Sequence, residues 1–94
     1  MSTQVINGRG KLYNVDGERL IAIVSYQIWE RPQTEYTLGE WWGGFILEDV
    51  YLFIQGEYMI ELQDKRKGNI IITNIILRAG AFNYYQFRGT GQLA

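Results

Sequence analysis

The chain has no cysteine and no histidine, and these two absences exclude several kinds of chemistry. Without cysteine there is no disulfide framework, no thiolate metal site and no cysteine nucleophile. Without histidine, the commonest general base and the commonest metal ligand are both missing. We therefore expect no catalytic residues, no metal and no cofactor, and a protein that is not an enzyme.

An excess of charge of one sign is also lacking, because nine basic residues are balanced by ten acidic residues. A protein that binds duplex DNA usually carries a strong basic excess. No apolar run approaches the roughly 18 residues that span a bilayer. The first residues lack the basic and apolar regions of a signal peptide. We expect a cytoplasmic protein that does not enter a membrane.

Proline occurs once in 94 residues, and strand-forming residues dominate the rest of the chain. Hydrophobic residues make up 47% of the sequence, which is enough for one packed core. Turn signals such as Asp16-Gly17 separate the apolar runs. The predicted strands span 5–15, 19–30, 36–47, 50–55, 58–63, 70–77 and 81–93. The sequence therefore predicts a single all-β domain over residues 1–94. Its architecture is a small, mostly antiparallel β-barrel or barrel-like sandwich of six to seven strands in meander order.

Two similar glycine pairs lie near the two ends of the chain, Gly8 with Gly10 and Gly89 with Gly91. Glycines two apart on a strand lie on the same face of the sheet. Their missing side chains leave room for a large ring and let the strand coil sharply. The pattern predicts that the terminal strands lie side by side, with core aromatics over the glycines. It is not a dinucleotide fingerprint, because Tyr13 stands where the third glycine is needed.

The polar run 64–69 predicts a tight turn between two strands. Asp64 favours turn entry, and Gly68 suits the left-handed position of a bulged hairpin. Replacement of Gly68 with valine is therefore predicted to destabilise the fold.

Two predicted strands are apolar on both faces, although a barrel has only one interior. The surplus apolar residues are Ile21, Ile23, Ile71, Ile75 and Leu77. A folded-over loop or a second sheet layer could cover them, but the chain has no predicted helix or long loop to do so. We therefore predict that these residues form the interface of a homo-oligomer.

Basic and aromatic residues suggest a different surface. A basic run lies at the predicted hairpin tip, where it is more often a solvated turn. Further basic residues would lie beside tyrosines if the terminal strands paired, as in OB-type barrels that hold single-stranded nucleic acid. The candidate nucleic-acid contacts are Arg9, Lys11, Tyr13, Lys65, Arg66, Lys67, Tyr85 and Arg88.

Adjacent tryptophans in a strand point to opposite faces, so one of Trp41 and Trp42 belongs in the core. The other, with Trp29, suits a protein interface, or else a platform for a sugar or other small molecule. The predicted function is a non-catalytic binding or structural module that acts through self-association and contact with another macromolecule, such as a protein. The alternative is an OB-like barrel that binds single-stranded nucleic acid. A third interpretation is a small-ligand-binding β-barrel with an aromatic-lined pocket.

Overall fold

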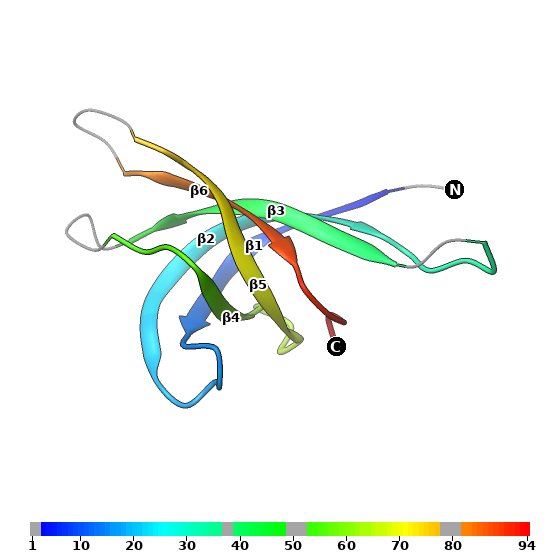
Figure 1. Ribbon diagram of the computed structural model, residues 1–94, viewed down its shortest axis with the longest axis horizontal. Helices are drawn as coiled ribbons and strands as arrows, with labels where there is room; N and C mark the ends of the chain where they lie inside the picture. The colour runs from blue at the N-terminus through cyan, green and yellow to red at the C-terminus, as the bar shows by residue number, and fades with distance from the viewer. Residues whose placement is uncertain (1–2, 37–38, 49–52, 78–81) are drawn as a thin grey trace.

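The computed structural model describes residues 3–36, 39–48, 53–77 and 82–94, and these residues form six strands and no helix (Figure 1). The strands are β1 (Gln4–Tyr13), β2 (Leu20–Arg31), β3 (Glu40–Leu47), β4 (Glu57–Glu61), β5 (Lys67–Ile76) and β6 (Tyr84–Gly89). They close into a barrel in the order β1-β2-β3-β6-β5-β4, and every neighbouring pair is antiparallel. The predicted all-β fold class is confirmed.

The strand order is not the predicted simple meander. Strands β1, β2 and β3 are consecutive neighbours, and so are β4, β5 and β6. The chain crosses the barrel between β3 and β4, so that β4 lies beside β1 and β6 lies beside β3. A fourth strand that returns to the first is the Greek-key arrangement. The predicted pairing of the terminal strands is therefore wrong, because β4 occupies the place beside β1 that the prediction gave to the last strand.

The predicted strand at 50–55 is not found in the part of it that is described. Positions 50–52 lie outside the described residues, and Phe53 to Gln55 belong to no strand. The predicted Asp16-Gly17 turn is confirmed, because Gly17 has a φ of 77° and its N–H donates to the Asn14 carbonyl at 2.8 Å. The turn brings the chain back along β1 as β2.

The left-handed position predicted for Gly68 is wrong. The hairpin between β4 and β5 closes earlier, because the Leu62 N–H donates to the Arg66 carbonyl at 2.8 Å. Within this turn Lys65 has a φ of 79°, and the Arg66 N–H donates to the Asp64 carboxylate at 3.0 Å. Gly68 already lies in β5, opposite Ile60.

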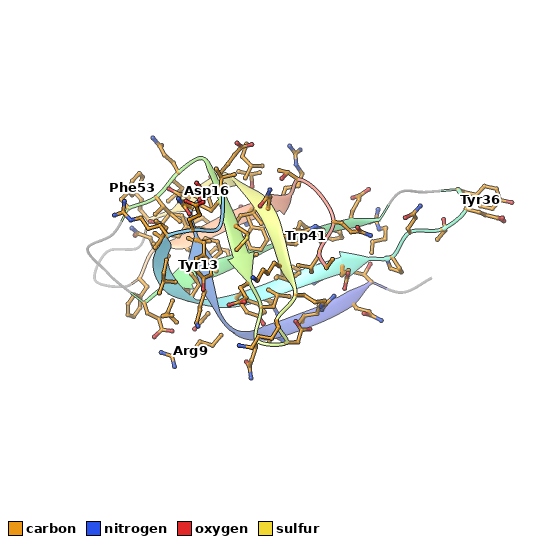
Figure 2. The ribbon with its side chains drawn as sticks, turned by 90° about the horizontal axis from the view of Figure 1, so that it is seen from below. Arg9, Tyr13, Asp16, Tyr36, Trp41 and Phe53 are labelled. Carbon is orange, nitrogen blue, oxygen red and sulfur yellow. The ribbon has the colours of Figure 1, made fainter. Side chains whose placement is uncertain are left out.

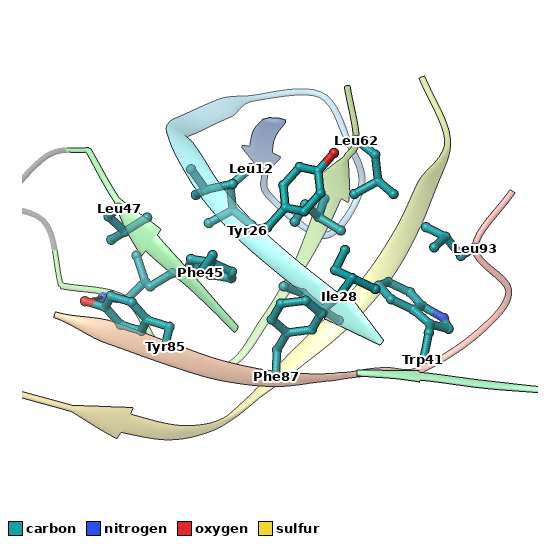
Figure 3. Close-up of a cluster of buried hydrophobic side chains, with 14 residues drawn as sticks. Leu12, Tyr26, Ile28, Trp41, Phe45, Leu47, Leu62, Tyr85, Phe87 and Leu93 are labelled. Carbon is teal, nitrogen blue, oxygen red and sulfur yellow. Dashed lines mark hydrogen bonds between the residues drawn. The ribbon is translucent and has the colours of Figure 1, made fainter. Parts of the chain in front are cut away.

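The barrel interior is filled by apolar side chains from all six strands and from the segments that follow them (Figure 3). Three aromatic rings form its centre. The Phe45 ring stacks on Tyr85 at 5.6 Å between centroids, and Phe87 lies 5.6 Å from Phe45. Burial of each such side chain contributes about 1.5–3 kcal/mol. The buried core comprises Leu12, Val24, Tyr26, Ile28, Trp41, Phe45, Leu47, Ile54, Ile60, Leu62, Ile70, Tyr85, Phe87 and Leu93.

The ring of Tyr26 lies over the first glycine pair. A Cβ atom at Gly8 would lie 2.6 Å from the Tyr26 hydroxyl, and one at Gly10 would overlap the main-chain carbonyl of Glu61. The Tyr26 hydroxyl also accepts a hydrogen bond from the Gln63 N–H at 3.0 Å. The glycines therefore let β1 approach both a core ring and the backbone of β4.

The ring of Trp41 lies over Gly89 of the second pair and over Gly68. A Cβ atom at Gly89 would overlap the indole, and one at Gly68 would lie 2.5 Å from its Cζ2 atom. The indole Nε1 donates to the Gly91 carbonyl at 2.7 Å, and Leu93 lies beside the ring at this end of the core (Figure 3). The prediction that the glycine pairs make room for core aromatics is confirmed for Gly8, Gly10 and Gly89.

Candidate binding surfaces

A row of cross-strand neighbours crosses the outer surface of the barrel. Trp29 lies opposite Trp42, and Trp42 lies opposite Arg88. The row continues to Ile71 on β5, opposite Arg88, and to Val5 on β1, opposite Trp29. Side chains alternate along each strand, so this row faces away from the buried neighbours at the next positions. We call these five residues, Val5, Trp29, Trp42, Arg88 and Ile71, the tryptophan row.

The two adjacent tryptophans point to opposite faces of β3, as predicted. Trp41 is 5% exposed and belongs to the core, whereas Trp42 is half-buried on the outside. The guanidinium carbon of Arg31 lies 5.5 Å from the centre of the Trp42 ring, and Arg31 also forms an ion pair with Glu40 at 3.7 Å. A cation over an exposed ring contributes about 0.5–1 kcal/mol, which helps to fix the orientation of the ring.

A groove of about 790 Å³ lies along the middle of the row, at Trp29, Trp42 and Arg88. Its walls combine aromatic, amide and charged side chains. Among them Gln86 accepts a hydrogen bond from the Asn74 amide at 3.1 Å, and Tyr84 covers Gly44 closely enough that a Cβ atom there would overlap its ring. The lining residues on the outer face include Trp29, Glu40, Trp42, Tyr84, Gln86 and Arg88. The groove therefore offers apolar contact and hydrogen-bonding groups side by side.

The five candidate interface residues do not share one surface. Ile71 belongs to the tryptophan row, whereas Ile23 lies opposite Lys11 on the β1–β2 side of the barrel. Leu77 follows the end of β5 and is 69% exposed. The two remaining residues, Ile21 and Ile75, pack against the core.

The expectation that Ile21 and Ile75 lie on the outer face is wrong, and β-bulges are the reason. The register between β1 and β2 passes over Ile21. The register between β5 and β6 passes over Thr73, so Ile75 lies opposite the buried Tyr85. A bulge inserts one residue and reverses the inside–outside alternation beyond it. Two of the surplus apolar residues of these strands, Ile21 and Ile75, therefore pack against the core and not on the outer surface.

A second groove, of about 500 Å³, brings together three of the candidate nucleic-acid contacts. Arg9 and Lys11 of β1 and Lys65 of the β4–β5 turn line it, together with Glu61 and Gln63. These basic residues meet because β1 lies beside β4, and not through the pairing of terminal strands that the sequence suggested. In Figure 2 Arg9 lies at the surface, on the opposite side of the molecule from the tip that carries Tyr36.

Carboxylates compensate much of the positive charge around this groove. Arg9 holds Glu48 through two hydrogen bonds, at 2.6 and 2.8 Å. The hydrogen bond from Arg9 lowers the pKa of Glu48, and the same bond raises the pKa of Arg9. The charge of Arg9 is therefore directed toward Glu48.

The basic run at the turn is compensated in the same way. Arg66 contacts Asp64 at 2.9 Å and Glu30 at 3.3 Å, and the main-chain N–H of Arg66 is the first cause of the lowered pKa of Asp64. Lys67 lies 3.8 Å from Glu61. Most of this run therefore carries a paired charge.

The three remaining candidate nucleic-acid contacts, Tyr13, Tyr85 and Arg88, do not line the second groove. Tyr85 is fully buried beside Phe45, so its assignment as a stacking residue is wrong. Arg88 lies in the tryptophan row, away from the second groove. Tyr13 is half-buried, opposite Met59 on β4.

Within the described ranges there is no group of three or more acidic side chains arranged to hold a metal ion, and no helix that could cross a membrane. Comparison of the chain with protein-family models, with curated proteins and with solved structures gives no match in any of the three.

Proposed function

We propose that the protein is a non-catalytic binding module that acts through self-association and contact with another macromolecule. The tryptophan row is the observation that carries this proposal. Tryptophan and arginine are the residue types most enriched among the residues that dominate protein interfaces. In this row two tryptophans and an arginine are direct neighbours on three adjacent strands.

The barrel does not need the outer tryptophans for its own core. Neither Trp29 nor Trp42 belongs to the buried cluster. Each leaves part of a large apolar ring at the surface, next to the exposed side chain of Arg88. A partner that covered the row would remove this apolar area from water, which is favourable at about 25 cal/mol per Å² before the cost of association.

Sedimentation velocity over a range of protein concentrations tests self-association. We expect Trp42→Ala to weaken association by about tenfold or more, as is usual for a central aromatic anchor. Tyr36→Ala is the matched control, because Tyr36 is 87% exposed at the far tip of the β2–β3 hairpin (Figure 2). Its removal should leave association unchanged. An unmodified chain that is monomeric at roughly 100 μM would contradict the proposal, since an interface of standard size is populated well below that concentration.

Binding of single-stranded nucleic acid is a second candidate, and the meeting of Arg9, Lys11 and Lys65 in one groove favours it. Retention on a single-stranded DNA column should then decrease as salt increases. The double variant Lys11→Gln, Lys65→Gln should reduce the slope of log affinity against log salt by the equivalent of up to about two phosphate contacts. Absence of retention at low salt would exclude this candidate and leave the first proposal untouched.

A further inference from the structure

The N-terminal half of β1 has a strand partner on one side only. Along its whole length β1 pairs with β2. On its other side it pairs with β4 only through Lys11, Leu12 and Tyr13. From Gln4 to Gly8, no strand in the described part of the chain pairs with this second side.

The direction of one main-chain group shows which residues face this open side. The Arg9 N–H donates to the side-chain oxygen of Gln63 at 3.4 Å, on the β4 side of β1. Main-chain groups alternate between the two sides of a strand, so the N–H and C=O groups of Val5 and Asn7 also face the open side. On β5, by contrast, a main-chain group beyond the pairing with β4 has a partner within the chain, because the Ile75 N–H donates to the Asn74 side-chain oxygen at 3.0 Å.

Within residues 3–8, the open edge carries no charged residue, no proline and no bulge that would oppose strand addition. Natural sheets protect their edges with lysine, proline, charged side chains or bulges. Residues 3–8, Thr-Gln-Val-Ile-Asn-Gly, contain no charged residue and no proline. The irregularity in the pairing of β1 lies at Leu12 and Tyr13, beyond this segment. The edge is therefore suited to pairing with another extended strand.

We propose that this edge pairs with the same edge of a second copy of the chain, antiparallel, with the twofold axis at Val5. This inference rests on the self-association in the proposed function, and it adds a second contact, the open edge of β1, to the one made by the tryptophan row. A twofold axis makes the contact self-complementary. Val5 would then lie opposite the partner's Val5, and Thr3 opposite the partner's Asn7, with no like charges brought together.

Continuity with the tryptophan row favours a second copy over an unrelated strand. Val5 is the β1 member of that row, and it is 50% exposed at the edge of the sheet. A second copy places an identical apolar side chain directly opposite it, and such cross-strand pairs are favourable. The two rows then form one apolar row across the dimer, which runs from Trp42 and Trp29 of one copy through the paired Val5 residues to the same tryptophans of the other.

Cysteine cross-linking tests this geometry directly, since the chain has no cysteine of its own. Hydrogen-bonded antiparallel neighbours have Cα atoms about 5.5 Å apart, within the range of about 4.4–6.8 Å that a disulfide needs. Val5→Cys should therefore form a covalent dimer under mild oxidation. Val15→Cys is the matched control, because Val15 is also 50% exposed but lies after β1, outside the edge. We expect the Val5 variant to cross-link about tenfold faster or more.

A second pair of variants separates true pairing from random encounters. Val5→Lys should raise the dissociation constant of the dimer about tenfold or more, because an edge lysine opposes its own copy across the axis. Val15→Lys should leave it unchanged. Equal cross-linking rates for the two cysteine variants would overturn the edge pairing, and the proposed function would stand if sedimentation still showed self-association. A monomeric unmodified chain would overturn both.

Discussion

The glycine pairs at the two ends of the chain have the same spacing, but their surroundings differ. Gly8 and Gly10 both lie under the Tyr26 ring, and Gly10 also abuts the backbone of β4. In the second pair Gly89 lies under Trp41, whereas a Cβ atom at Gly91 would meet nothing within 4 Å. The contribution of Gly91 is its carbonyl, which accepts the indole N–H. Equal spacing thus produces a site for a core ring at each end. Whether a larger residue can replace each glycine depends on what lies above it, which is backbone, a ring or open space.

The largest expected effect is that of Gly10→Leu. The added side chain would overlap the Glu61 carbonyl, and a backbone group held in the β1–β4 pairing cannot swing away. We expect a loss of about 3 kcal/mol in the free energy of unfolding, at the upper end for overpacked cores. Gly91→Leu should change it by less than about 0.5 kcal/mol, as is usual for surface sites. Urea denaturation measures both, and similar losses for the two variants would contradict the comparison.

Gly68→Val should have a smaller effect, because its obstacle is a side chain. A Cβ atom at Gly68 would lie 2.5 Å from the Trp41 ring, so the ring would have to shift to restore ordinary van der Waals contact, at a cost of about 1–2 kcal/mol. If the ring is the cause, the cost should shrink in a Trp41→Leu background, and a double-mutant cycle measures that coupling. Equal costs in the two backgrounds would show that the strand itself resists the valine.

Tyr26→Phe tests the hydrogen bond that anchors the first ring. The variant keeps the ring over Gly8 and Gly10 but leaves the Gln63 N–H without its acceptor. A loss of about 1 kcal/mol in the free energy of unfolding is expected. Thermal unfolding followed by circular dichroism provides the measurement, and an unchanged stability would mean that water replaces the hydroxyl.

The smallest effect concerns the middle residue of each pair, which is Arg9 in the first and Thr90 in the second. Arg9→Thr places a threonine at the middle position of both pairs. It also removes the hydrogen bond that lowers the pKa of Glu48. In the unmodified protein this pair stabilises the folded state above the unfolded pKa of Glu48, and the contribution is lost as the pH falls through the lowered folded value. NMR titration of the Glu48 carboxyl carbon should show its pKa rising toward the ordinary value in the variant. An unchanged pKa would assign the shift to another cause.

Local sequence patterns predicted much of this fold. Strand-forming runs, the Asp16-Gly17 turn and the division of Trp41 and Trp42 between two faces all follow from rules that act over a few residues. The order of the strands does not follow from such rules. Nothing local distinguishes a meander from a chain that crosses the barrel after β3, so the β1–β4 and β3–β6 neighbours had to come from the structure.

The candidate surfaces were predictable only in part. The sequence singled out Trp29 and Trp42 but did not place them opposite each other, although Pro32 and Gly39 mark the two ends of the connection between their strands. Counting the same number of residues from Pro32 back into one strand and from Gly39 forward into the other would have placed Trp29 opposite Trp42. The bulge that turns Ile75 inward has no comparable signal, since it depends on the packing of β5 against β6.

The Greek-key crossing also bears on the rate of folding. The hairpins β1–β2–β3 and β4–β5–β6 join strands that are near in the sequence, whereas closure of the barrel must pair Lys11 with Glu61 and Trp42 with Arg88. The loop entropy of such distant pairings is lost before their contacts form, and β-barrels rich in them fold in about milliseconds to seconds. Until closure, β1 and β3 expose their full edges to other chains, and this is the stage of folding at which the protein is most prone to aggregate.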